Sequence, residues 1–170
     1  LPGYGHSDRP PLLYSASLYE AFVEDLIDDL TDEPIVVASS LTNSYAAAAA
    51  QNVEMERLIS ICPTDSSMGS RNVLVRGLLR SPVIGTGLYN LMVSKPSIRY
   101  FNTDHGYYDS ENMSEEIVDY EWTSGHQPGA RFAFASFASG FLNPEGSLEE
   151  HLSNVDIPIT FVWGRNADVT

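Results

Sequence analysis

Two adjacent serines, Ser39 and Ser40, stand where a short apolar run passes into an alanine-rich segment that is typical of a helix. The strands of a parallel sheet read as runs of Val and Ile, and the polar residues at their carboxyl ends are where such sheets place ligands and reacting groups. A serine on a tight turn from strand to helix can act as a nucleophile, because its side chain stands clear of the sheet and the next backbone N–H can bind an oxyanion. The alternative is that both hydroxyls only cap the helix.

The residues around the two serines indicate which one would react. The turn requires small residues two positions before and after the nucleophile, and Ala38 and Thr42 stand at those positions around Ser40. Centring the turn on Ser39 would place two bulky, branched residues there instead. Thr42 is itself branched, and its crowding of the turn favours a competing possibility, a protein of this architecture without catalysis.

Predicted strands and helices alternate along the chain. Apolar recurrence every three or four positions predicts a helix over residues 17–30, with Ser17 and Glu20 as a capping box, and the small residues of 41–55 predict a second helix. Three short apolar runs predict buried strands, at residues 34–39, 57–62 and 157–164. Strand, helix and strand in this order indicate an α/β fold with a parallel sheet and right-handed crossovers.

Roughly ninety residues separate the second and third predicted strands, far more than an ordinary connection needs. Pro82, Pro96 and the turn at 127–129 interrupt this segment, and Ser147 with Glu150 predicts the cap of a last short helix. Between these breaks the apolar and aromatic residues have helical spacing in four stretches, at 70–80, 85–93, 114–122 and 129–142. The sequence therefore predicts a helical insertion in an otherwise α/β chain.

Three segments in this order resemble the α/β-hydrolase fold family. The opening LPGYGHSDRP resembles the family's Pro-Gly-x-Gly-x-Ser loop, residues 38–42 resemble its nucleophile elbow, and the final FVWGRNADVT resembles the strand and loop that carry the catalytic acid. The resemblance implies a partial α/β-hydrolase fold, a parallel sheet flanked by helices with a helical cap insertion. It divides the chain into a core part at 1–63, a cap at 64–155, and a core strand with the acid loop at 156–170.

The resemblance also assigns roles to individual residues. It makes Ser40 the nucleophile, Asp168 the acid of a Ser-His-Asp triad, and the backbone N–H of Leu41 an oxyanion donor. The family's order places the triad histidine after the acid, whereas all four histidines of the chain precede it: His6, His105, His126 and His151. We therefore expect a fragment that lacks the N-terminal strands and the histidine segment, and we expect the fragment alone to be inactive.

The function implied by the resemblance is hydrolysis of a small carbonyl-containing molecule, through an ester or related bond, by a serine esterase or a carbon–carbon hydrolase. A serine nucleophile argues against the dehalogenase and epoxide-hydrolase branches, which use an aspartate. Aromatic residues in the insertion favour an apolar substrate, although such stripes are more often core. The alternative is a non-catalytic binding or scaffold protein. No cofactor is expected.

The charge of the chain is strongly negative, with 23 acidic against 9 basic residues and a formal net charge of -14. Nucleic acids and anionic membranes are therefore poor partners. Lys95 is the single lysine and the remaining basic residues are arginines, a balance that predicts adaptation to concentrated salt, where screening relieves the repulsion among acidic side chains.

Cys62 is the only cysteine, so an internal disulfide is excluded, and we expect it to be a small core residue. No Cys/His cluster has the spacing of a zinc site, so no metal is expected. The chain contains neither the basic start and apolar body of a signal peptide nor the ~18 uninterrupted apolar residues of a membrane span. These features predict a cytoplasmic protein, and they indicate no oligomeric state.

Overall fold

The computed structural model describes residues 1–30, 33–64, 69–165 and 167, which form two compact units. The first unit combines Leu1–Leu13 with Arg71–Ser139, and the second combines Tyr14–Ser70 with Gly140–Thr170. The opening loop thus groups with most of the helical insertion. The domain boundaries implied by the sequence remain a prediction.

The second unit contains a parallel sheet of three strands in the order β1-β2-β3. Ala38 of β1 lies opposite Ser60 of β2, and Ser60 lies opposite Phe161 of β3. The bounds of the strands are Ile35–Ser39 for β1, Arg57–Ile61 for β2 and Ile159–Val162 for β3. All three predicted strands are confirmed, and with them the α/β fold class.

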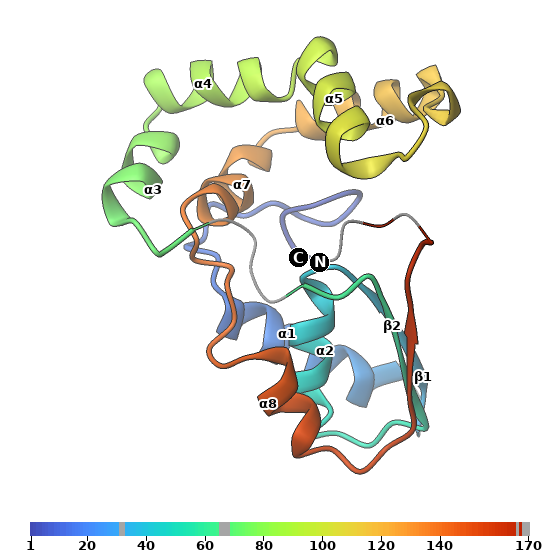
Figure 1. Ribbon diagram of the computed structural model, residues 1–170. Helices are drawn as coiled ribbons and strands as arrows, with labels where there is room; N and C mark the ends of the chain where they lie inside the picture. The colour runs from blue at the N-terminus through green and yellow to red at the C-terminus, as the bar shows by residue number, and fades with distance from the viewer. Residues whose placement is uncertain (31–32, 65–68, 166, 168–170) are drawn as a thin grey trace. The chain divides into compact units, whose positions relative to one another are not determined.

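Three helices belong to this unit, namely α1 (Ala16–Leu30), α2 (Thr42–Ala49) and α8 (Leu148–Ser153), and they lie together on one side of the sheet (Figure 1). The alanines of α2 are almost all buried, because small side chains let a helix approach a sheet closely. Beside them Tyr45 is fully buried, and its hydroxyl donates a 2.5 Å hydrogen bond to the carbonyl of Leu142. Burial, together with the charge of Glu20, raises the pKa of the Tyr45 phenol far above its ordinary value.

The predicted burial of β1 applies to one face of the strand only. Ala38 and, on β2, Leu58 are buried beneath the helices, whereas Ile35 and Val37 are 52% and 59% exposed. Successive side chains of a strand point to opposite faces, so burial on alternate residues means that the described helices cover only one face.

The start of α1 and the end of α2 differ from their predicted positions. Helix α1 begins at Ala16, and its cap is Ser15, whose side-chain oxygen accepts the N–H of Leu18 at 3.2 Å, so the predicted box of Ser17 and Glu20 is wrong. Helix α2 ends at Ala49, before the predicted end at residue 55, because the chain must turn within a few residues to enter β2 at position 57. The predicted capping box of Ser147 and Glu150 is confirmed.

The first unit is helical. The four helical stretches expected in the insertion are confirmed as α3 (Val73–Arg80), α4 (Ile84–Met92), α6 (Glu115–Gly125) and α7 (Ala130–Ala138). A further helix, α5 (Lys95–Phe101), lies outside the predicted stretches, because the sequence predicts a break at Pro96. Proline is tolerated in the first turn of a helix, where its missing N–H would have no intrahelical partner, so Pro96 opens α5 instead.

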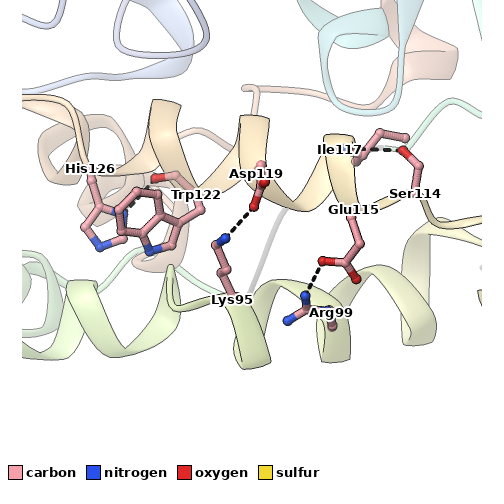
Figure 2. Close-up of polar contacts among 8 residues, drawn as sticks. All are labelled: Lys95, Arg99, Ser114, Glu115, Ile117, Asp119, Trp122 and His126. Atoms are coloured by element: carbon pink, nitrogen blue, oxygen red, sulfur yellow. Dashed lines mark hydrogen bonds and ion pairs between the residues drawn. The ribbon is translucent and has the colours of Figure 1, made fainter.

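Ion pairs join α5 to α6. Lys95 pairs with Asp119, and Arg99 pairs with Glu115, while Ser114 caps α6 by accepting the N–H of Ile117 (Figure 2). A π-helical turn, Asn102–Gly106, and a short 3-10 turn, Ser110–Asn112, connect the two helices. Over the described residues, no helix combines the length and apolarity needed to cross a membrane.

Candidate active site

Ser40 lies at the junction between β1, which ends at Ser39, and α2, which begins at Thr42. Its φ angle is +54°, in the left-handed region that residues other than glycine rarely adopt. The next residue, Leu41, has returned to φ −60° and ψ −27°. The chain therefore reverses direction at Ser40 itself, and the serine is exposed at the carboxyl end of the strand.

Hydrogen bonds to the neighbouring strand hold this turn. The N–H of Ser40 donates to the carbonyl of Ile61 at 3.0 Å, and the carbonyl of Ser40 accepts the N–H of Asn43 at 3.1 Å. The Asn43 side chain adds two bonds, since its Nδ2 donates to the carbonyl of Ser40 at 2.8 Å and to that of Ile61 at 3.2 Å. A strained backbone conformation persists only where its surroundings over-determine it, and these four bonds do so here.

The sequence reasoning missed Asn43. It is completely buried, and its Oδ1 has no hydrogen-bond partner among the described residues. The available signal was its place three residues after Ser40 in the first turn of α2, where an amide side chain commonly bonds back to nearby backbone groups. Its bond to Ile61, 18 positions away, had no such local signal.

Leu41, expected to supply an oxyanion donor, follows Ser40 directly and has a buried side chain. In the described part of the chain its backbone N–H makes no hydrogen bond. Stabilisation of an oxyanion needs a backbone N–H that is not already bonded and that follows the nucleophile directly. Its role remains a prediction.

Cys62 follows β2 as Ser40 follows β1. Its φ angle is +40°, its N–H donates to the carbonyl of Val162 at 2.9 Å, and it is half-buried. The carboxyl ends of both strands therefore carry a non-glycine residue in the left-handed region. The sequence predicts Cys62 as a small core residue, whereas it is half-buried and lies at the carboxyl end of β2.

Two of the histidines make hydrogen bonds to groups other than Ser40. Asp168, the predicted acid, lies outside the described residues. His151 is in the same unit, but its Nε2 faces the carbonyl of Glu145 at 2.9 Å and its Nδ1 faces the Gln51 amide at 3.0 Å. His126 lies in the other unit, where its Nδ1 contacts the carbonyl of Trp122 at 2.7 Å (Figure 2).

No group of three His, Cys, Asp or Glu side chains within the described ranges could hold a metal ion. The chemistry that the arrangement supports is that of the serine itself. Ser40 presents an exposed hydroxyl on a hydrogen-bonded turn, and the N–H of the following residue makes no hydrogen bond to any described residue. This pairing suits attack on a carbonyl carbon.

Solved structures share this fold. An epoxide hydrolase, CorEH, matches with a TM-score of 0.67 and 21% sequence identity over 97% of this chain and 63% of its own. A bromoperoxidase from Bacillus anthracis matches with a TM-score of 0.65 and 13% identity over 96% of this chain and 60% of its own. A haloalkane dehalogenase from Agrobacterium tumefaciens C58 matches with a TM-score of 0.57 and 16% identity over 95% of this chain and 60% of its own.

The chain therefore spans about three fifths of the length of these structures, and at such identities the likeness concerns the fold alone. No curated protein matches the sequence significantly. The model of the alpha/beta hydrolase family, however, matches residues 1–170. Together with the parallel sheet and the strand-to-helix turn at Ser40, this match shows that the chain belongs to the alpha/beta hydrolase family.

Proposed function

We propose that the protein is a serine hydrolase that cleaves an ester or related bond in a small, apolar, carbonyl-containing molecule, with Ser40 as its nucleophile. The observation that carries the proposal is the left-handed backbone of Ser40 between β1 and α2. A serine that only caps a helix has an extended backbone, so the helix-capping alternative does not account for the φ angle of +54° at Ser40. A sharp turn that lifts the side chain out of the sheet does account for it.

The proposed reaction has two stages. The Ser40 hydroxyl attacks the carbonyl carbon while a histidine takes its proton, and the Leu41 N–H binds the resulting oxyanion. The histidine then protonates the leaving group, and water hydrolyses the acyl-enzyme by the same route. We place that histidine C-terminal to Asp168, whose carboxylate would orient the imidazole.

The substrate does not follow from the structural relatives. Their names describe a bromoperoxidase, an epoxide hydrolase and a haloalkane dehalogenase, three different chemistries on one fold. A serine at position 40 favours acyl transfer. The competing proposal is a non-catalytic binding or scaffold protein, which is supported by the branched, half-buried Thr42 two positions after the serine.

Covalent labelling tests the proposal. A fluorophosphonate probe is expected to label the full-length protein, and Ser40→Ala is expected to abolish labelling and to lower ester hydrolysis by several orders of magnitude. Ser39→Ala is the matched control, since it removes the neighbouring hydroxyl and is expected to cost far less. Equal, small losses in both variants would support the helix-capping alternative and with it the non-catalytic protein.

A further inference from the structure

The first unit contains a cavity of about 220 Å³, and every residue that lines it belongs to this unit. The opening loop and helices α4 to α7 form its wall. Its apolar side consists of Tyr89, Val93, Ile98 and Phe134. Two charged residues, Arg9 and Glu121, line the same cavity.

Arg9 presents a guanidinium whose hydrogen-bonding capacity is mostly unused. One terminal nitrogen donates to the carbonyl of Gly5, while the Nε atom is buried and has no hydrogen-bond partner among the described residues. No carboxylate of the described chain pairs with it. A guanidinium remains charged in proteins, and a buried donor without a partner costs free energy, so this group is suited to an anion.

The positive charge of Arg9 acts on Tyr89, which lies in the apolar wall of the cavity. Burial raises the pKa of Tyr89 to about 12, and the positive charge of Arg9 opposes that rise. The Tyr89 hydroxyl already donates to the carbonyl of Gly125 at 2.9 Å. The phenol therefore stays neutral and cannot neutralise the guanidinium.

Glu121 supplies the opposite charge. One of its carboxylate oxygens accepts a 2.9 Å hydrogen bond from the amide of Asn102. Within the residues that the structure describes, it pairs with no cation, Arg9 included. One cavity thus has a cationic and an anionic side chain in its wall, each without a counter-ion.

The backbone beside Arg9 is held in place. A side chain on Gly129, which has a φ angle of +85°, would put its Cβ 2.2 Å from the carbonyl oxygen of Arg9. Only glycine permits this approach, so the start of α7 lies directly against the loop. The N–H of Gly3 closes the loop by donating to the carbonyl of Asp8 at 2.8 Å. A preformed wall of this kind lowers the ordering cost of binding.

We propose that this cavity binds a single free amino acid with an apolar side chain. Its carboxylate would pair with Arg9, its ammonium group with Glu121, and its side chain would contact the aromatic rings of Tyr89 and Phe134. The volume is smaller than the ~300–1,000 Å³ of sites for drug-sized ligands, which suits a ligand of the size of one amino acid. This proposal does not depend on the hydrolase activity of Ser40.

Ligand analogues that lack one charge provide the first test. L-leucine, 4-methylpentanoate and 3-methylbutylamine share an apolar body, but the second has no ammonium group and the third has no carboxylate. Isothermal titration calorimetry of the full-length protein is expected to show binding of L-leucine, and at least about tenfold weaker binding of each analogue. Equal affinities, or no heat of binding from L-leucine at millimolar concentrations, would overturn the proposal.

Variants give the second test. Arg9→Gln and Glu121→Gln are each expected to weaken L-leucine binding by about tenfold. Arg99→Gln is the matched control, because it removes the surface ion pair with Glu115 (Figure 2) and Arg99 does not line the cavity, so the affinity is expected to stay within about twofold. An unchanged affinity in folded Arg9→Gln protein, with near-ultraviolet dichroism as the measure of folding, would refute the assignment. Fluorophosphonate labelling reports on Ser40 separately, so either proposal can fail alone.

Discussion

Replacement of Ser40 by glycine is expected to stabilise the protein while it removes the proposed nucleophile. Ser40 has a φ angle of +54°, and an L-residue in the left-handed region costs about 1–2 kcal/mol, whereas glycine adopts this region without steric penalty. The substitution removes an exposed hydroxyl and keeps the backbone bonds from Ser40 to Ile61 and Asn43. Little packing is therefore lost.

The net effect is smaller than the strain that is relieved. Glycine raises the conformational entropy of the unfolded chain, which costs about 0.5–1 kcal/mol. We therefore expect Ser40→Gly to raise the free energy of unfolding by about 0.5 kcal/mol. Ser39→Gly is the matched control, because residue 39 ends β1 and its φ angle is not positive. It carries only the entropic cost and is expected to lower the free energy of unfolding by about 0.5–1 kcal/mol.

Urea unfolding of the full-length protein, followed by far-ultraviolet dichroism, measures both changes. The two glycine variants are expected to differ by roughly 1–1.5 kcal/mol, in favour of Ser40→Gly. Ser40→Ala retains the strain and should lie within about 0.5 kcal/mol of the unmodified protein. If Ser40→Gly is no more stable than Ser39→Gly, residue 40 does not have a strained backbone, and the case for a nucleophile on this turn loses its main support.

Asn43→Ala removes two amide hydrogen bonds of the turn and is expected to cost about 2 kcal/mol in urea unfolding, against about 0.5 kcal/mol or less for the exposed Asn52→Ala; equal costs would mean that Asn43 does not support the turn. The pKa of Tyr89 is raised to about 12, so its contribution to stability is complete below pH ~10 and is lost as pH rises toward 12. Tyr89→Phe should reduce this alkaline loss in a pH series of unfolding curves, and an unchanged loss would contradict the assignment. The melting temperature of the full-length protein is expected to rise from dilute to molar salt, and a flat or falling trend would remove the inference of salt adaptation.

Several helices and strands could be predicted from residues that are neighbours in the sequence. The strands at 35–39 and 57–61 are short apolar runs, and the cap of α8 is a local pair of Ser147 and Glu150. The missed helix α5 shows the limit of such rules, because proline breaks a helix interior but suits its first turn, and Pro96 alone does not say which applies. The same holds at α1, where Ser15 and Ser17 are both able to cap.

The sequence by itself determined the α/β class and the order of the three strands, and it favoured Ser40 over Ser39 as the proposed nucleophile, because these depend on periodicity and on residues within a few positions of one another. Only the tertiary structure decided that Ser40 is left-handed, that Asn43 ties it to Ile61, and that Arg9 and Glu121 line one cavity. The bond from Asn43 to Ile61 and the shared lining of Arg9 and Glu121 bring together residues far apart in the chain, and the same bond helps to hold the left-handed turn at Ser40. Their geometry arises when the strands pair and the helices pack, and no local pattern encodes it.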